Sequence, residues 1–241
     1  MTNITEKTKA IVIQSIRYGD SSLIVKMLTE EYGIQSYMVK GVFGGKSKFR
    51  PALFQNMTIL DIVAASGKGS LSFIKEISLT HNYNDILFNI KKSSIILFMC
   101  ELLSKSIPEA ETDKVLFDYV HKTLLWLDEA KDNYTNIPLV FAMRLCQHLG
   151  FFPNTESYKE NYHFDIFEGK FTREDNLLYP IDTELSKDFY DVCSQEINQI
   201  NLNINNKKRR QLLEIVVYYY KLHIDNVKEI QSYEILREIF E

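Results

Sequence analysis

Residues 10–39 read AIVIQSIRYGDSSLIVKMLTEEYGIQSYMV, and this stretch decides the predicted fold of the amino-terminal part of the chain. It contains three runs rich in Ile, Val and Leu, at residues 10–16, 22–28 and 34–39. Two short segments that contain glycine, Tyr18-Gly-Asp and Glu31-Tyr-Gly, separate these runs and are typical of turns. The pattern predicts three consecutive β-strands joined by short turns.

Two further apolar runs follow at residues 57–64 and 71–79, separated by a glycine-containing turn. In the second run the alternate positions are mostly apolar, which predicts that these side chains share one face of a strand. They are Leu71, Phe73, Ile77 and Leu79, with Lys75 interrupting them. Five short strands in so short a segment suggest a small barrel, and the OB-fold is the commonest barrel of five strands.

From residue 81 onward the apolar spacing becomes helical. Residues 152–182 carry little periodicity, and we interpret them as an irregular insertion with room for a short hairpin. The predicted architecture is therefore α+β: a five-stranded OB-fold barrel at residues 1–80, followed by an all-α domain at residues 81–241. The predicted helices cover residues 84–107, 114–130, 137–149, 184–199, 207–223 and 232–240.

The composition is that of an ordinary soluble protein, with 45% hydrophobic and 25% charged residues. Residues 1–9 lack the apolar core of a signal peptide, and the apolar stretch near residues 94–100 is too short to span a bilayer. We therefore expect a cytoplasmic protein with no membrane partner. Cys100, Cys146 and Cys193 form no C-x-x-C pair, so we expect buried, reduced thiols.

Charge is distributed unevenly along the chain. The formal net charge is −4, but residues 1–75 carry +5 and the remainder carries −9. Such asymmetry indicates a basic binding module joined to an acidic body. The first part is therefore where we look for a site that binds a polyanion.

A glycine-rich basic loop at residues 40–51 is the first candidate site. Lysine and arginine neutralise phosphates, aromatic rings offer faces for unstacked bases, and glycine lets the backbone approach a ligand closely. The alternative interpretation is a solvated loop that protects a sheet edge from aggregation. The predicted DNA-binding residues are Lys40, Phe43, Lys46, Lys48, Phe49 and Arg50.

A second basic run lies where a helix is predicted to begin. Cations at the amino end of a helix oppose its dipole, so a sequence that keeps them there could need positive charge for a ligand. The alternative is that these side chains simply extend into water. The run consists of Lys207, Lys208, Arg209 and Arg210.

The sequence offers no positive sign of catalysis, of a cofactor or of a metal site. The five histidines show no ligand spacing, and no carboxylate pair or nucleophile motif appears. We therefore expect a binding protein and not an enzyme.

Three blocks of sequence resemble the RecO family of bacterial recombination mediators. The first is YGDSSLIVKMLTEEYG at residues 18–33, with VKG at residues 39–41 and KSK at residues 46–48. The second is FAMRLCQHLGFFP at residues 141–153. The third is YYKLHID at residues 219–225 together with IQSYEILREIF at residues 230–240. They occur in the order typical of the family and span nearly the whole chain.

The resemblance implies an OB-fold that binds single- and double-stranded DNA, with no covalent chemistry and no nucleotide hydrolysis. It implies RecR and the acidic carboxyl-terminal tail of single-stranded-DNA-binding protein as partners, and RecA as an indirect one. The implied work is strand annealing and displacement of the binding protein, in the cytoplasm and in association with the nucleoid. We place the tail near Lys207–Arg210, with a pocket beside Val216 and Tyr220. Arg144 is the competing location.

One departure from the family concerns zinc. Many members carry four cysteines in the insertion, whereas residues 153–162 here read PNTESYKENY and contain none. We therefore predict a chain without zinc, because structural zinc needs about four N or S ligands. We expect an aromatic mini-core to take the place of the metal, formed by Tyr158, Tyr162, Phe164 and Phe167.

Two other functions stay open on the sequence. One is a general OB-fold nucleic-acid chaperone that acts on RNA as readily as on DNA. The other is a protein-interaction scaffold in which the basic loop serves only solubility.

Overall fold

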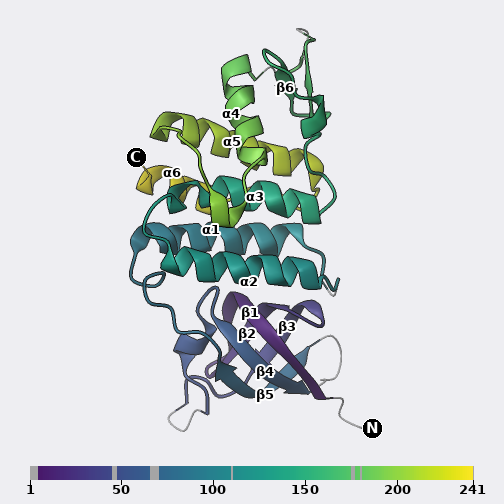
Figure 1. Cartoon of the computed structure of the whole chain (residues 1–241). Helices are drawn as coiled ribbons and strands as arrows, with labels where there is room; N and C mark the ends of the chain where they lie inside the picture. Colours follow the sequence, from purple (N-terminus) through teal and green to yellow (C-terminus); the bar gives the residue numbers. More distant parts are fainter. Residues whose placement is uncertain are drawn as a thin grey trace. The chain divides into compact units, whose positions relative to one another are not determined.

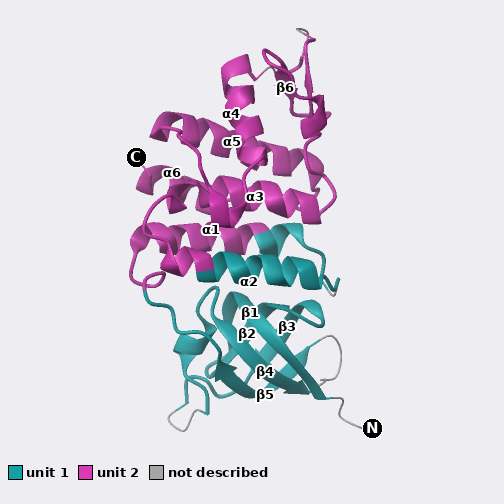
Figure 2. Cartoon of the chain, viewed as in Figure 1, with its two compact units in different colours: residues 1–84, 103–125 teal, residues 85–102, 126–241 magenta. Residues whose placement is uncertain are grey.

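The computed structural model describes residues 5–44, 48–65, 71–109, 111–174, 177–179 and 181–240. The chain forms two compact units, Met1–Asn84 with Leu103–Leu125 and Asp85–Leu102 with Trp126–Glu241 (Figure 2). Helices α1 (Ile90–Ser106) and α2 (Lys114–Glu129) each belong in part to both units. A domain boundary at residue 80 stays a prediction.

The first unit contains a closed barrel of five strands in the order β1-β2-β3-β5-β4 (Figure 1). Strand β1 is long enough to pair with both β2 and β4, which closes the barrel. Strands β3 and β5 pair in parallel and all other neighbours are antiparallel. The predicted OB-fold is confirmed. The strands are β1 (Thr5–Tyr18), β2 (Ser22–Thr29), β3 (Gly33–Val39), β4 (Ile59–Ala65) and β5 (Ser72–Leu79).

Alternation along the strands fills the interior of this barrel. Val25 and Met27 on β2 and Tyr37 and Val39 on β3 are fully buried in one hydrophobic cluster. Each such side chain contributes about 1.5–3 kcal/mol to folding through removal from water. The local pattern that predicts the strands therefore also supplies the barrel core.

Strand β5 departs from the predicted alternation. Ala64 and Val63 on β4 pair with Ile74 and Glu76, so Lys75 is an extra residue without a partner across the ladder. Such a bulge reverses the alternation beyond it. Ile74 is buried as a result, and Leu79 is 43% exposed, so the prediction that Leu71, Phe73, Ile77 and Leu79 share a face is wrong.

Residues 103–125 complete the first unit. Lys26 on β2 donates a hydrogen bond from Nζ to the Ser104 carbonyl oxygen at 3.1 Å. Gly33 has a φ of +65°, and a Cβ at that position would collide with the Glu111 carbonyl oxygen. Glycine is therefore required here for its conformation and for the close approach of the two backbones.

The second unit is mainly helical. It contains α3 (Ile137–His148), α4 (Thr183–Cys193), α5 (Asn206–His223) and α6 (Ser232–Ile239), besides parts of α1 and α2. The helix predicted at residues 84–107 begins only at Ile90, because the Asp128 carboxylate accepts the backbone N–H groups of Asp85 and Ile86. The helix predicted at residues 184–199 ends at Cys193 and gives way to a short 3-10 turn. None of the described helices is long and apolar enough to cross a membrane.

The insertion contains the short hairpin that the sequence allows, formed by β6 (His163–Asp165) and β7 (Lys170–Thr172). Phe164 is fully buried, and its ring centre lies 5.0 Å from that of Phe171 and 4.4 Å from that of Phe189 on α4. Tyr158 joins the same cluster through Phe171. The predicted mini-core is thus confirmed for Tyr158 and Phe164, whereas Phe167 is 40% exposed and lies outside it.

Cys100, Cys146 and Cys193 are buried and form no disulfide, as predicted. Burial raises the pKa of the Cys146 and Cys193 thiols. Among the described residues no group of three or more His, Cys, Asp or Glu side chains lies close enough to hold a metal ion. The expected lack of zinc stays a prediction for metal analysis.

Candidate nucleic-acid interface

The basic loop after β3 presents cations at one end of the barrel. Lys40, Lys48 and Arg50 are exposed. The Lys40 Nζ lies 4.5 Å from the centre of the Phe73 ring, and Lys48 donates from Nζ to the Lys75 carbonyl oxygen at 2.7 Å. Lys46 lies outside the described residues. Lys40 and Lys48 thus contact β5, and all three described cations are accessible to a polyanion.

The two aromatic residues predicted in this loop have different environments. Phe43 is 43% exposed and offers a ring face to a ligand. Phe49 is only 8% exposed and packs into the hydrophobic core of the barrel. The structure therefore does not support Phe49 as a platform for bases. Its ring anchors the loop instead, because burial of a large aromatic side chain dominates local packing.

The turn between β1 and β2 adds two residues that the sequence analysis missed. The Arg17 guanidinium lies 4.8 Å from the centre of the Phe43 ring. The Phe43 N–H donates to the Ser21 carbonyl oxygen at 3.2 Å, which fixes the loop against this turn. Tyr18 is 57% exposed. An exposed aromatic residue next to a glycine turn, beside an arginine, is the signal that could have identified them.

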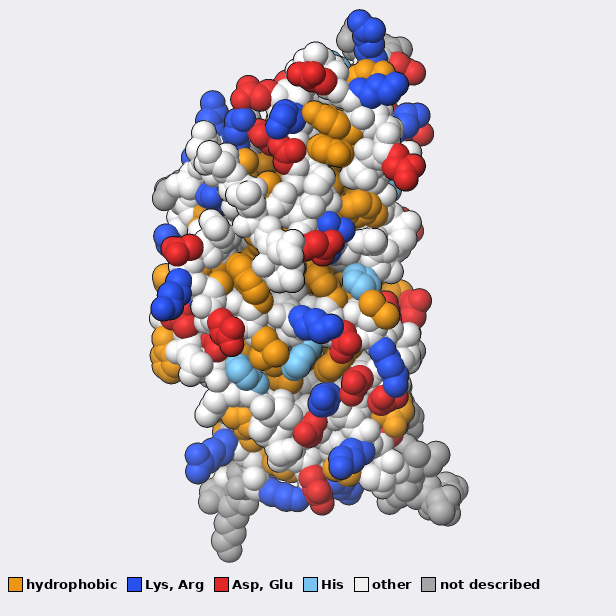
Figure 3. Space-filling model, viewed as in Figure 1, with side chains coloured by type: hydrophobic (Ala, Val, Ile, Leu, Met, Phe, Trp, Pro, Cys, Tyr) orange, Lys and Arg blue, Asp and Glu red, His pale blue; other side chains and the backbone are white. Residues whose placement is uncertain are grey.

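We call these side chains the basic aromatic surface. Figure 3 shows Lys and Arg side chains over the barrel, together with some Asp and Glu side chains. The basic aromatic surface consists of Arg17, Tyr18, Lys40, Phe43, Lys48 and Arg50.

The second basic run is partly occupied by contacts within the second unit. Lys208 forms ion pairs with Glu184 and Asp188, both at 2.7 Å, and these hydrogen bonds raise the pKa of its ammonium. Arg209 donates from Nε to Asn136 Oδ1 at 2.8 Å, and burial lowers the pKa of its guanidinium. Lys207 is exposed and Arg210 is half-buried. Two of the four cations therefore hold α5 in place.

The pocket predicted beside Val216 and Tyr220 is not formed among the described residues. Val216 and Tyr220 are fully buried, so neither can line an open pocket. An apolar slot instead lies next to Arg210, with room for about 10 Å³, which is space for roughly one water molecule. Pro138, Leu139, Arg209, Leu213, Leu236, Arg237 and Phe240 also line it.

The competing position, Arg144 on α3, is also engaged. Its Nε donates to the Gln195 carbonyl oxygen at 2.7 Å, and its guanidinium forms an ion pair with Glu196 at 3.0 Å. The side chain is 16% exposed. Arg144 therefore joins α3 to the segment after α4, and little of its charge faces solvent.

A closed OB-fold barrel with cations and exposed aromatic rings at one end is the architecture of a nucleic-acid-binding protein. Comparison with known proteins gives the particular family. Residues 1–83 match the family model "Recombination protein O N terminal", and residues 87–161 match "Recombination protein O C terminal". The chain belongs to the RecO family.

Relatives in several bacteria support this assignment over nearly the whole chain. The chain is similar to DNA repair protein RecO of Flavobacterium psychrophilum, with 36% identity over 97% of this chain and 98% of that protein. The RecO proteins of Christiangramia forsetii and Bacteroides fragilis are 33% and 30% identical, again over at least 97% of each chain. Membership of this family gives the chain a role in DNA repair and recombination.

Proposed function

We propose that this protein binds single- and double-stranded DNA through the basic aromatic surface and anneals complementary strands. With RecR, it would help to load RecA onto DNA that is coated by single-stranded-DNA-binding protein. It performs no covalent chemistry, and its place of action is the cytoplasm, in association with the nucleoid. The observation that carries the proposal is the Arg17–Phe43 contact at 4.8 Å among exposed cations at one end of an OB-fold barrel.

Phosphate binding supplies most of the affinity in this proposal. Lys40, Lys48 and Arg50 are exposed and contact the sugar-phosphate backbone, which releases condensed counterions. This term is independent of sequence, as a protein that handles any damaged strand requires. Lysine and arginine side chains that bind phosphates also reduce the electrostatic repulsion between two strands, which favours annealing.

Exposed rings distinguish single strands from duplex in this proposal. Tyr18 and Phe43 present aromatic faces on which unstacked bases can stack, each stacked base contributing about 1–3 kcal/mol. Arg17, which already lies on the Phe43 ring, can add a cation–π contact or bind the adjacent phosphate. Bases inside a duplex are not available for such stacking, so these rings favour the single strand.

The acidic tail of single-stranded-DNA-binding protein is assigned to the amino end of α5, with Arg144 as the competing location. Lys207 is exposed, and Arg210 is half-buried and borders the apolar slot. A carboxylate there would gain from the positive end of the helix dipole as well as from the two side chains. Asn205 already caps the N–H of Lys208, so side-chain charge carries most of this site.

An annealing assay tests the proposal directly. Two complementary strands, each coated with single-stranded-DNA-binding protein, are mixed with and without this protein, and duplex formation is followed by fluorescence quenching. We expect annealing to accelerate with the wild type and not with a variant in which Lys40, Lys48 and Arg50 are replaced by Ala. Equal rates with and without the protein would contradict the proposal.

Two alternatives are separated by simple measurements. A general nucleic-acid chaperone binds and anneals RNA as readily as DNA, and it does not rescue a RecO-deficient strain. A protein scaffold binds neither nucleic acid, and any residual association lacks the steep decrease of affinity with salt that phosphate contacts impose.

A further inference from the structure

An apolar groove in the second unit lies between the insertion and α5, and none of the residues assigned to DNA lines it. It has a volume of about 590 Å³, within the range of about 300–1,000 Å³ typical of ligand sites. Residues of the segments 178–179 and 181–185 form one side, and the outer face of α5 forms the other. The lining consists of Ile166, Leu178, Tyr179, Ile181, Asp182, Leu185, Gln211, Glu214, Ile215 and Tyr218.

Several large apolar side chains around this groove are exposed to solvent. Leu178 is 77% exposed, Tyr179 is 53% exposed and the adjacent Phe167 is 40% exposed. The rings of Phe167, Tyr179 and Tyr218 form a continuous wall. The centre of the Tyr179 ring lies 5.5 Å from that of Phe167 and 5.8 Å from that of Tyr218. Contiguous exposed apolar surface with a polar rim is typical of an interaction site.

The charged residues that line the groove are all acidic. Asp182 and Glu214 are exposed carboxylates, and no Lys or Arg belongs to the lining. Asp182 also caps α4 by accepting the Leu185 N–H at 2.8 Å, so its position is fixed. Tyr179 and Tyr218 add phenol hydroxyl groups to the lining.

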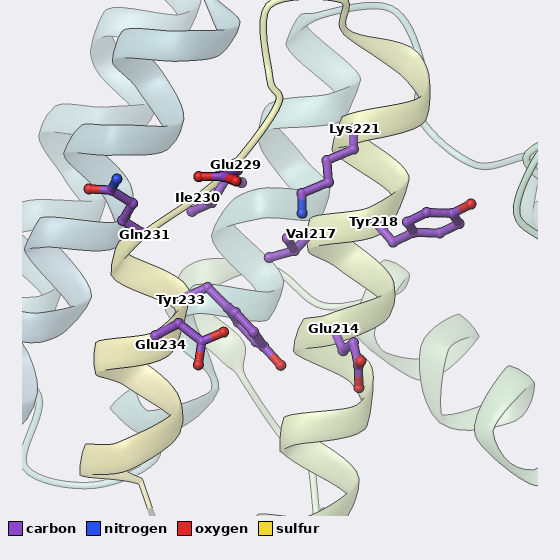
Figure 4. A pocket seen from close by; sticks show the side chains of 9 residues that line it. All are labelled: Glu214, Val217, Tyr218, Lys221, Glu229, Ile230, Gln231, Tyr233 and Glu234. Atoms are coloured by element: carbon purple, nitrogen blue, oxygen red, sulfur yellow. The ribbon is translucent and has the colours of Figure 1, made fainter.

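A second hollow of about 420 Å³ on the other flank of α5 continues this acidic surface. Glu214 and Tyr218 line both hollows. Figure 4 shows the Tyr218 ring directed away from Tyr233 and Glu234, which also line the second hollow. Glu229 and Glu234 add carboxylates there, partly balanced by Lys221 in the lining and by an ion pair of Glu234 with Arg237.

We propose that the groove binds a peptide segment of a partner protein that carries an arginine flanked by large aliphatic residues. Charge complementarity carries this choice: an apolar groove whose rim holds two carboxylates and no cation attracts a positively charged peptide and repels both DNA and acidic peptides. The groove is therefore a different site from the basic aromatic surface that is proposed to bind DNA. It also differs from the site proposed for the acidic tail at the amino end of α5.

Arginine fits the lining better than lysine. Its planar guanidinium can lie on the Tyr218 ring and at the same time form a bidentate ion pair with Glu214, one helical turn away on α5. An aliphatic side chain beside it covers Leu178 and Tyr179, which are the most exposed apolar residues of the wall. Arginine and tyrosine are among the residue types that most often form hot spots of protein interfaces.

The test uses three fluorescein-labelled peptides that differ at one position. All have the same Leu- and Ile-rich sequence, with Arg, Gln or Glu at the centre, and their binding to the full-length protein is measured by fluorescence anisotropy. We expect the Arg peptide to bind at least about tenfold more tightly than the Glu peptide, a difference of about 1.4 kcal/mol. Leu178→Asp and Glu214→Lys should each weaken binding of the Arg peptide by about tenfold or more.

Phe88→Asp is the matched control, because Phe88 is 82% exposed, is equally apolar and does not line the groove. It should leave peptide binding unchanged, and circular dichroism should show that all three variants are folded. Because Leu178 and Glu214 do not belong to the basic aromatic surface, their replacement should leave DNA binding intact, which separates this proposal from the proposed function. No binding of the Arg peptide, equal binding of the three peptides, or normal binding by either groove variant would overturn the proposal.

Discussion

Arg17 and Phe43 are twenty-six positions apart in the chain, and the guanidinium of one lies 4.8 Å from the ring centre of the other. The contact joins the β1–β2 turn to the basic loop after β3, and the backbone hydrogen bond from Phe43 to Ser21 reinforces it. A cation on an exposed ring at the end of an OB-fold barrel combines the two elements that a single strand needs, charge for phosphate and a face for a base.

The first prediction concerns stacking on these rings. Replacement of Phe43 by Ala should weaken binding of a single strand by about 1–3 kcal/mol, which is roughly fivefold to a hundredfold, and binding of duplex much less. The same holds for Tyr18→Ala. Fluorescence anisotropy with a labelled single strand and a labelled duplex measures both, and Phe88→Ala is the control for loss of an exposed ring. Equal loss for both forms of DNA would contradict a stacking role.

The second prediction tests the close approach of Glu111 to the barrel. Gly33 and Gly19 both have positive φ, +65° and +60°, but a Cβ collides with Glu111 only at Gly33. Gly19→Ala should cost about 1–2 kcal/mol in the free energy of unfolding, the conformational term alone. Gly33→Ala should cost distinctly more. Urea denaturation of both variants gives the comparison, and equal costs would show that the approach is not tight.

The third prediction is that the insertion is stabilised by aromatic packing and not by zinc. The purified protein should contain no stoichiometric zinc and should unfold at the same temperature with and without chelator. Phe164→Ala should lower the free energy of unfolding by about 3–5 kcal/mol, because the side chain is fully buried among Phe171 and Phe189. One zinc per chain would contradict the prediction that the protein lacks zinc. A small effect of Phe164→Ala would contradict the role of aromatic packing.

The fourth prediction concerns the acidic tail. Charge reversal of Lys207 and Arg210 together should weaken binding of an acidic peptide that ends in Phe by about tenfold or more, since Lys207 is exposed and Arg210 borders the apolar slot at the amino end of α5. Arg209 is left intact because it holds Asn136. Reversal of Arg144 is the comparison, with circular dichroism as the check on folding. Loss only in the Arg144 variant would move the site to α3.

The barrel was predictable from sequence because its signals are local. Apolar runs of strand length and glycine turns at Gly19 and Gly33 mark the first three strands within a few residues of their observed ends. The bulge at Lys75 was not predictable, because it depends on how β4 and β5 meet across the closed barrel. The late start of α1 has a similar origin, since Asp128 takes up the N–H groups of residues 85 and 86 from far along the chain.

The candidate site was predictable only in part. Composition identifies the cations Lys40, Lys48 and Arg50, because charge in a glycine-rich loop is almost always exposed. It cannot distinguish Phe43 from Phe49, since which ring is buried depends on the barrel that the loop covers. Arg17 belongs to a predicted turn region, and only the tertiary fold brings it onto a ring of another loop.

The salt dependence of DNA binding tests the central claim most directly. The measurement compares the wild type with a variant in which Lys40, Lys46, Lys48 and Arg50 are all replaced by Ala. The control variant replaces four exposed lysines elsewhere, namely Lys91, Lys122, Lys131 and Lys228. Both variants lose the same charge, so a difference between them reports the location of the site and not the net charge.

We expect the loop variant to bind a single strand about tenfold or more weakly, and its slope of log affinity against log salt to decrease by roughly 0.7 for each lost phosphate contact. The control variant should keep the slope of the wild type. Unchanged affinity and slope in the loop variant, or an equal loss in both variants, would contradict the assignment of DNA binding to this end of the barrel.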